Sequence, residues 1–155
     1  MSFSFSDRSR AELKGVHPDL IAVVERALVL TTQDFCVHDG VRTPEQQKAL
    51  VHAGASKTLN SRHLIRSDGF GHAVDLVPWI GGKPRWDWTP IYRVAEAVRR
   101  AGVERGVRLT WGGVWDRLLA DLPETATGLE AAVRAYTVRH PGPDFIDGPH
   151  YELAA

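Results

Sequence analysis

Three polar residues stand in stretches where polar residues are costly, and their types suit metal chemistry. His63 lies in a polar loop that precedes an apolar run, Asp75 lies inside that run, and His150 lies in the apolar closing segment. A carboxylate in the middle of an apolar strand is unfavourable unless it is paired or bound to a metal. Two imidazoles and one carboxylate form a ligand set suited to zinc, with a fourth position open for water. Because zinc lowers the pKa of such a water to about 7, the set predicts a catalytic metal site.

A second carboxylate precedes the last of these residues. Asp147 stands three residues before His150, with Gly148 and Pro149 between them. Residues three apart on a flat strand face opposite ways, but a Gly-Pro turn can bring both side chains to one place. Asp147 is then predicted to be the general base that takes a proton from the metal-bound water. The ordinary alternative is that Asp75 forms a buried ion pair and that the two histidines are structural. For any one of these residues alone this alternative is favoured, but for the whole set the metal site is favoured.

The elements that must position these residues can be predicted from hydrophobic spacing and capping signals. The chain has 155 residues, 43% of them hydrophobic, which fits one domain over residues 1–155. We expect helices over residues 10–14 (capped by Ser9), 18–30, 44–52 (with a capping box of Thr43 and Gln46), 90–105 and 130–139. Strands are expected over residues 35–38, 73–78 and 108–111, followed by an extended closing segment over 145–153. Helices and strands mix without a regular alternation, which indicates an α+β fold.

Composition excludes several other classes of protein. Nineteen basic and nineteen acidic residues give a net charge of zero, which argues against a nucleic-acid partner held by bulk charge. A single cysteine, Cys36, excludes an internal disulfide framework and any site built from several cysteines. No apolar run approaches the roughly 18 residues of a membrane span, and no secretory signal peptide is evident. We therefore expect no membrane insertion and synthesis in the cytoplasm.

Several motifs together resemble a known family. They are SRHL at residues 61–64, GHAVDL at 71–76 and DGPHYEL at 147–153, supported by GVHPDL at 15–20, GVRTPEQQ at 40–47 and WGG at 111–113. The chain resembles the zinc peptidases that cut peptidoglycan stem peptides: D,D-carboxypeptidases, vancomycin-resistance D,D-dipeptidases and phage L-alanyl-D-glutamate endopeptidases. The likeness is strongest to the phage endolysins. It implies a small antiparallel sheet flanked by helices, in a single domain of the D-Ala-D-Ala carboxypeptidase/hedgehog-like type.

The resemblance also implies roles for individual residues. His63, Asp75 and His150 match the ligands of one Zn²⁺ ion, and Asp147 matches the general base. Arg42 matches an arginine that faces a substrate carboxylate or the developing oxyanion, a role suited to a fixed cationic fork. From the residues alone, an Arg42–Glu45 pair at a helix start ranks equally.

Three further residues are candidates for contacts with substrate. Ser61 matches a serine near the substrate, but its position also fits a residue that caps the loop. Trp111 and Trp115 are candidates to wall the cleft, and core packing is at least as strong an interpretation for both.

The chain departs from the family pattern in one spacing. The family usually places the first histidine seven residues before the aspartate, whereas His63 stands twelve before Asp75, so residues 64–70 include five extra residues. Three interpretations are open: the loop bulges outward and leaves His63 in place, His72 replaces it, or Asp68 does. His72 should face away from Asp75 on an extended strand, and Asp68 would give a one-histidine site less typical of zinc. The SRHL context also favours His63, with residues 68–69 in a flap over the cleft.

The expected function is hydrolysis of peptidoglycan stem peptides by a zinc metallopeptidase, at the L-Ala–D-Glu bond. The resemblance implies a monomeric phage endolysin that causes host lysis, released from the host cytoplasm through a holin to act on the cell wall without a separate wall-binding domain. One alternative is a bacterial D,D-carboxypeptidase or D,D-dipeptidase. Another is a non-catalytic wall-binding or virion protein with a degenerate site, to which the inserted residues give the only support.

Overall fold

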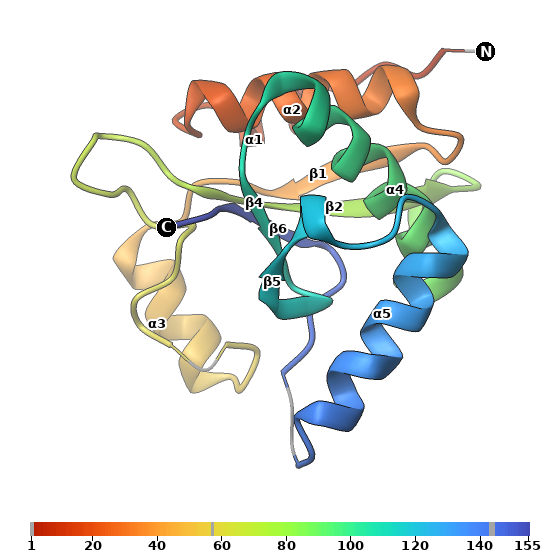
Figure 1. Ribbon diagram of the computed structural model, residues 1–155. Coiled ribbons are helices and arrows are strands. Elements are labelled where there is room, and N and C mark those ends of the chain that lie inside the picture. The colour runs from red at the N-terminus through yellow and green to blue at the C-terminus, as the bar shows by residue number, and fades with distance from the viewer. Residues whose placement is uncertain (1, 57, 143–144) are drawn as a thin grey trace.

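The structure, a computed structural model, describes residues 2–56, 58–142 and 145–155, and its centre is an antiparallel sheet. Figure 1 shows the sheet between the helices. The strand order is β1 (Phe35–Asp39), β2 (Ala73–Ile80), β6 (His150–Leu153), β4 (Leu109–Trp111) and β5 (Val114–Leu118), and the short β3 (Lys83–Pro84) pairs with the end of β2. The closing strand β6 thus lies between β2 and β4. This arrangement confirms the expected α+β fold with an antiparallel sheet.

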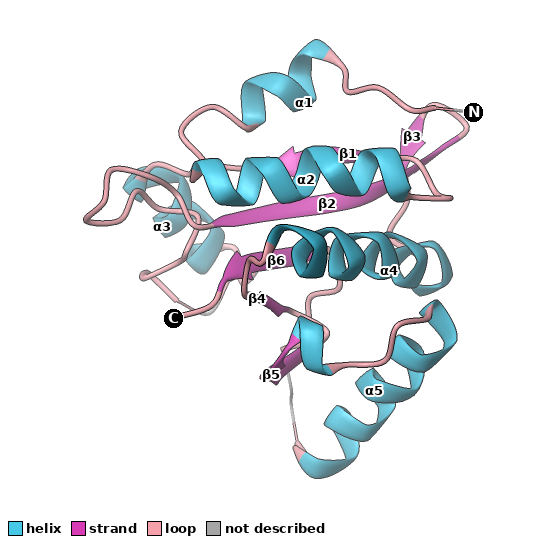
Figure 2. Ribbon diagram, turned by 45° about the horizontal axis from the view of Figure 1, so that its top comes forward, coloured by secondary structure: helices cyan, strands magenta, loops and turns pink. Residues whose placement is uncertain are grey.

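Helices cover mainly one face of this sheet. Helices α2 (Pro18–Leu30) and α4 (Trp88–Arg105) lie side by side across it, as Figure 2 shows. Their apolar faces and the facing strand residues form one hydrophobic core. The other helices are α1 (Asp7–Glu12), α3 (Pro44–His52), α5 (Ala126–Arg139) and a 3₁₀ turn at Leu119–Asp121.

Because side chains alternate between the two faces of a strand, some residues of β2 and β6 point away from the core. On β2, Val74 and Leu76 face the helices and join the core, so Asp75 between them points to the opposite face. On β6, Tyr151 joins the core, which leaves His150 and Glu152 on the same face as Asp75. The polar residues of both strands therefore gather on the face that α2 and α4 do not cover.

Local signals predicted several elements correctly. Helix α2 has the expected bounds, and in α3 the Thr43 hydroxyl accepts from the Gln46 N–H (3.1 Å) while the Gln46 side chain accepts from the Thr43 N–H (2.8 Å). Helix α4 ends at Arg105 and is capped by Gly106, whose positive φ of 66° suits glycine.

Other boundaries differ from the prediction. The first helix begins at Asp7, and Ser6 rather than Ser9 caps it. Ser9 is buried, and its hydroxyl accepts from the Val37 N–H of β1 (3.1 Å). Helix α5 begins four residues before the expected residue 130, only residues 150–153 of the closing segment form a strand, and β3 and β5 were not predicted. Strand β5 carries exposed polar residues at the sheet edge, so its sequence lacks an apolar run.

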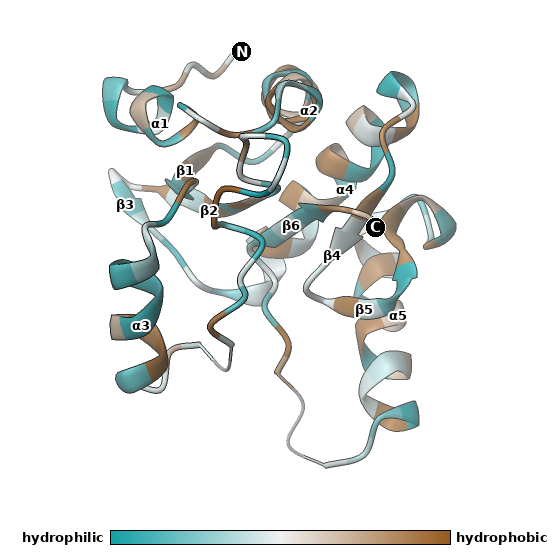
Figure 3. Ribbon diagram, turned by 90° about the vertical axis from the view of Figure 1, so that its left-hand side faces the viewer, coloured by the Kyte–Doolittle hydropathy of each residue, from teal (hydrophilic) through white to brown (hydrophobic). Residues whose placement is uncertain are grey.

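The distribution of hydropathy agrees with this architecture. Brown, hydrophobic segments gather toward the middle of Figure 3, whereas α3 is mainly teal. Gln47 is the buried residue of α3. Among the described residues, no helix combines the length and the apolar character needed to cross a bilayer.

Candidate metal centre and its cleft

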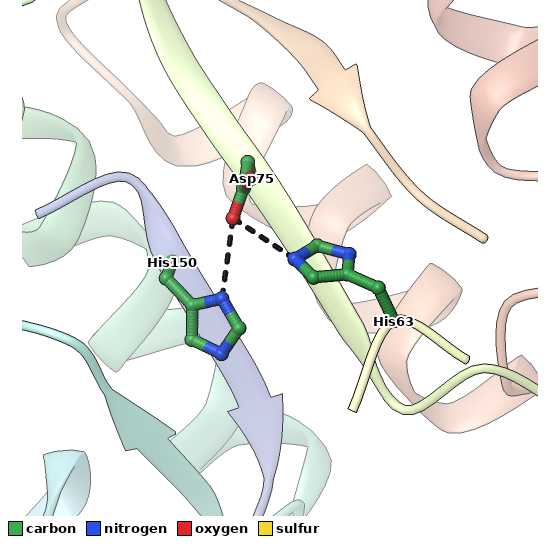
Figure 4. Close-up of side chains that lie close together, drawn as sticks. All are labelled: His63, Asp75 and His150. Carbon is green, nitrogen blue, oxygen red and sulfur yellow. Dashed lines mark hydrogen bonds and ion pairs between the residues drawn. The ribbon is translucent and has the colours of Figure 1, made fainter. Parts of the chain in front are cut away.

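His63, Asp75 and His150 meet on the uncovered face of the sheet, as Figure 4 shows. The Asp75 Oδ1 atom lies 3.2 Å from His63 Nε2 and 3.2 Å from His150 Nδ1. One ligand atom from each residue lies within 4.8 Å of the other two, and this is the only such group in the described part of the chain. The structure thus brings together the three predicted ligands.

Two of these residues are positioned by strand pairing. Asp75 and His150 are direct partners in the register of β2 and β6, so their side chains stand side by side on one face. Asp75 is 9% exposed and His150 is 7% exposed. Asp75 and His150 are 75 positions apart in the sequence, and the antiparallel pairing of β2 and β6 brings them into contact. No local sequence signal specifies this contact.

His63 comes from a loop that backbone hydrogen bonds hold in place. Its carbonyl accepts from the Arg42 N–H (2.9 Å), and its own N–H donates to the Ser61 hydroxyl (3.1 Å). On the ring, Nδ1 lies 2.7 Å from the Gly40 carbonyl oxygen. That contact leaves Nε2 directed toward Asp75.

The inserted residues form a small hairpin outside the group. Ile65 bridges to Gly71, and the Arg66 N–H donates to the Phe70 carbonyl (2.8 Å). Asp68 lies within the hairpin and His72 lies beside it. Asp68 Oδ2 is 2.7 Å from His72 Nε2, so these two residues pair with each other. Of the three interpretations, the structure fits the one in which the loop bulges outward and His63 stays beside Asp75.

A cavity of about 420 Å³ opens beside the three residues. Its lining includes Asp147 and Trp115, and the Trp115 ring packs against the His150 ring with centroids 5.3 Å apart. The rest of the lining comes from Arg42 before α3, from the loop after α3 that carries His63, and from the closing segment: Arg42, Ala55, Ser56, Thr58, Asn60, Ser61, Arg62, His63, Phe145, His150 and Glu152. A site at the floor of such a cleft is open to a ligand.

The electrostatics of the group follow from burial and close charges. Burial and the negative charge of Asp75 raise the pKa of Asp147 to about 6, against the opposite effect of nearby cations. Burial also disfavours charge on Asp75, but His63 and His150 outweigh it and hold the pKa of Asp75 well below its usual range. Burial likewise disfavours a charged His150, yet hydrogen bonds to Asp75 and Glu152 raise its pKa to about 10.

Arg42 has partners on three sides. Its Nε contacts Asp39 Oδ2 at 2.6 Å, Nη1 donates to Gln47 Oε1 at 3.0 Å, and Nη2 contacts Asp75 Oδ2 at 3.3 Å. The ion pairs of Arg42 are thus with Asp39 and Asp75 rather than with Glu45. The Asp75 contact leaves Oδ1 facing the two histidines.

The other candidate substrate contacts are divided between cleft and core. Ser61 lines the cleft, and its hydroxyl also caps the loop through the His63 N–H. Trp111 has no exposed surface, stacks near Tyr151 and donates from its indole to the Gly148 carbonyl (2.6 Å). The expectation that Trp111 contacts substrate is therefore not supported by its position, because β4 turns this side chain toward the helices.

Sequence reasoning missed residues that hold the site. Asp39 and Gln47 both contact Arg42, and Glu152 Oε1 lies 2.8 Å from His150 Nε2. A buried glutamine in a polar helix gives no signal by itself, since its burial depends on the loop that packs over it. Glu152, two residues after His150 on an extended segment, could have been found from strand alternation.

The donor set fits a metal such as zinc. Ligands about 2.0–2.1 Å from a tetrahedral zinc lie about 3.3 Å from each other, close to the two 3.2 Å separations found here. In each residue, protein contacts occupy one polar atom and leave the other for the shared centre. The three side chains therefore form a possible metal-binding triad.

Comparison with known proteins agrees with this geometry. The sequence profile of the phage L-alanyl-D-glutamate peptidase family matches residues 1–130. The chain is 35% identical over 120 residues to the L-alanyl-D-glutamate peptidase of Escherichia phage T5, covering 75% of this chain and 84% of that protein. It is 33% identical over 82 residues to the L-alanyl-D-glutamate peptidase of Listeria phage A118, covering 53% of this chain but only 26% of that protein.

A solved structure extends the likeness to the closing strand. The crystal structure of the Serratia marcescens L-Ala D-Glu endopeptidase ChiX superposes with a TM-score of 0.71 at 34% identity, over 99% of this chain and 90% of that one. This match includes the segment with His150, which lies beyond the residues matched by the family profile. The chain therefore belongs to the phage L-alanyl-D-glutamate peptidase family.

Proposed function

We propose that this protein is a zinc-dependent peptidase that hydrolyses the L-Ala–D-Glu bond of peptidoglycan stem peptides, acting as a phage endolysin. The observation that carries the proposal is the meeting of His63, Asp75 and His150 at a cleft that Asp147 also lines. Family membership and the names of the similar proteins support the choice of bond.

The residues of the cleft can divide the work of peptide hydrolysis. A zinc ion held by His63, Asp75 and His150 would polarise the scissile carbonyl and make the attacking water more acidic. Asp147 accepts the proton of that water and returns it to the leaving amine, a role for which a pKa raised toward neutrality is favourable. Ser61 holds the His63 loop at the cleft wall.

Arg42 is proposed to bind a negatively charged group of the substrate. Its guanidinium lines the cleft and is fixed by Asp39 and Gln47, so it does not need to be ordered when substrate binds. A fixed cation at this place favours a carboxylate of the D-Glu residue or the charge that develops on the scissile carbonyl.

The likeness to phage endolysins supports a proposal for the biological setting. The protein is proposed to act on the cell wall as a monomer after holin-mediated release from the host cytoplasm, with residues 1–155 forming the catalytic domain. Peptidoglycan is its expected macromolecular partner.

The deciding experiment is mass spectrometry of purified Gram-negative peptidoglycan after digestion with zinc-loaded protein. Stem peptides that have lost L-Ala and begin at D-Glu are the expected product. Loss of only the terminal D-Ala would show a D,D-carboxypeptidase instead, and an unchanged substrate across several pH values would favour a non-catalytic wall-binding protein.

Asp147→Asn is the matched variant for this experiment. It keeps the size of the side chain but removes the proton acceptor, so we expect product formation to fall by about 10²–10⁴-fold. Zinc content, measured on the same sample, should stay at the level of the parent. Cleavage at the parent's rate would show that Asp147 is not the general base.

A further inference from the structure

The His150 ring is held between two carboxylates. Its Nδ1 lies 3.2 Å from Asp75 Oδ1, and its Nε2 lies 2.8 Å from Glu152 Oε1. Figure 4 shows the first contact, with the second nitrogen of the ring directed away from Asp75. His150 and Glu152 are two residues apart on β6, so both side chains stand on the face that carries the candidate metal centre.

Glu152 is itself fixed. Its Oε2 atom lies 3.5 Å from Arg62 Nε, and its side chain is largely buried. Its backbone is anchored on both sides, because Glu152 pairs with Ala73 of β2 and with Thr110 of β4. The carboxylate is therefore held in front of His150 by the sheet and by an arginine.

Arg62 connects this pair to the loop of the first candidate ligand. It precedes His63 directly, and its carbonyl accepts from the N–H of His72, the residue just before β2 (2.8 Å). The Arg62–Glu152 ion pair thus joins the loop that carries His63 to the strand that carries His150.

In the metal-bound protein, the contact with Glu152 would determine which nitrogen of His150 keeps its proton. A neutral imidazole carries one ring N–H, and an ionised carboxylate can only accept a hydrogen bond. With a metal ion bound at the shared centre, the one remaining ring proton would therefore stay on Nε2, where it donates to Glu152, and Nδ1 would offer its lone pair to the metal. Gly40 does the same for His63 with the opposite nitrogen, because its carbonyl lies 2.7 Å from Nδ1.

We propose that Glu152 is a positioning residue for the metal centre. It fixes the tautomer and ring orientation of His150 so that Nδ1 binds the metal, and Arg62 holds Glu152 in place. This inference rests on the metal centre of the proposed function, but not on the identity of the bond that is cut.

The test compares Glu152→Gln and Glu152→Ala with the parent. Glutamine keeps an oxygen that can accept from Nε2 but loses the negative charge, and alanine loses both. Zinc affinity, measured by competition with a chromogenic chelator, should fall by about tenfold for Glu152→Gln and by up to about a hundredfold for Glu152→Ala. Arg62→Ala, which leaves the carboxylate present but less fixed, should give a smaller loss.

A second readout reports the tautomer directly. In long-range ¹H–¹⁵N spectra of the zinc-loaded parent, the His150 ring should be protonated at Nε2 and metal-bound at Nδ1. In Glu152→Ala, the Nε2 proton should exchange faster with water. The absorption spectrum of the cobalt(II)-substituted protein should also change in Glu152→Ala, because the ring is free to turn.

Glu130→Gln is the matched control. Glu130 also pairs with an arginine, Arg134 (2.9 Å), but lies on α5 outside the cleft, so its zinc affinity should equal that of the parent. Unchanged zinc affinity in both Glu152 variants, or an Nδ1-protonated His150 in the zinc-loaded parent, would overturn the proposal. Failure of the proposed function gives a different result: the parent would bind zinc in this way yet leave peptidoglycan uncut.

Discussion

The Asp75 carboxylate is negatively charged although it is buried. The site is built from the side chains that compensate this charge. His63 and His150 contact one carboxylate oxygen and Arg42 contacts the other. A buried charge that loses such partners costs about 3–5 kcal/mol. In the metal-free protein, the proton on His150 provides part of this compensation, so a metal ion must compete with that proton for the same nitrogen.

Zinc affinity should therefore increase with pH. Below its pKa of about 10, His150 in the metal-free protein carries a proton that it must lose to bind a metal. If one proton is displaced, the affinity falls by about tenfold for each unit by which the pH is lowered. Calorimetric titration at pH 6, 7 and 8, in buffers with different ionisation enthalpies, measures both the affinity and the released protons.

The exposed His52 of α3 provides a control for this measurement. His52→Ala should release the same number of protons as the parent. A zinc affinity that does not change between pH 6 and 8, with no proton released, would contradict the prediction.

The identity of the first ligand can be tested by three alanine variants. His63→Ala removes one of the three converging atoms and should lower the zinc content of the purified protein from about one ion per chain to near zero. Asp68→Ala and His72→Ala break a pair that lies outside the group, so both should keep the ion. Inductively coupled plasma mass spectrometry after gel filtration gives the stoichiometry, and zinc loss in either of the latter variants would reopen the other two interpretations.

At the scale of elements, pairing in the sheet brings the chemistry together. Asp75 and His150 are register partners, and the turn before β6 holds Asp147 against the end of β4. The Asp147 N–H donates to the Gly112 carbonyl (2.8 Å), and the Gly112 N–H donates to the His150 carbonyl (2.9 Å). Gly112 is therefore the point at which β4 sets the position of the predicted general base.

Gly112→Ala should impair catalysis by displacing Asp147. A Cβ at residue 112 would lie 2.1 Å from the Asp147 carbonyl oxygen, so the two backbones must move apart. A shift of about 1 Å at a catalytic group can cost about 10²-fold in rate, and overpacking costs about 1–3 kcal/mol of stability. We expect kcat to fall at least tenfold, measured together with urea unfolding.

Gly81→Ala separates this displacement from a general loss of stability. Gly81 has a φ of 62° in the turn after β2 and open space around it, so alanine there strains only its own backbone. Its stability should fall by about 1 kcal/mol while kcat is retained. Equal kcat in Gly112→Ala and the parent would show that Asp147 does not depend on this contact.

Elements with strong local signals could be predicted from the sequence, whereas those set by distant contacts could not. Helix α3 follows from Thr43, Pro44 and Gln46, which satisfy the first turn within four residues. Ser9 looks like a cap in sequence, yet the fold uses it to pair with β1, and the edge strand β5 exists because β4 offers it a partner. The role of Ser9 and the existence of β5 thus depend on pairing between residues that are distant in the sequence.

The same distinction applies to the candidate site. The three converging residues could be predicted because their types are unusual in apolar segments and their motifs resemble a family. Residues that act through other side chains were missed, since Gln47 and Asp39 are ordinary polar residues until the fold places them against Arg42. The burial of Trp111 likewise could not be predicted, because an indole beside two glycines suits both a cleft wall and a core.

At the scale of the whole molecule, the candidate ligands join parts of the chain that are far apart in sequence. His63 lies in the loop after α3, Asp75 on β2 and His150 on the closing strand β6. The three atoms come together only in the folded state, so unfolding must separate them. A metal ion that binds the folded state alone stabilises it through mass action.

Zinc should therefore raise the melting temperature of the metal-free protein. At a free zinc concentration of one hundred times the dissociation constant, the stabilisation is about 2.7 kcal/mol. For a domain of this size, each kcal/mol shifts Tm by about 2–4 °C, so the expected increase is about 5–10 °C. Differential scanning calorimetry of protein treated with a chelator, with and without added zinc, measures the shift. His63→Ala and His150→Ala should lose it, because each removes a ligand from the shared centre, whereas His72→Ala should keep it. An equal shift in His63→Ala would place the stabilising ion elsewhere on the molecule, and the pair of His72 and Asp68 would then be the first place to examine.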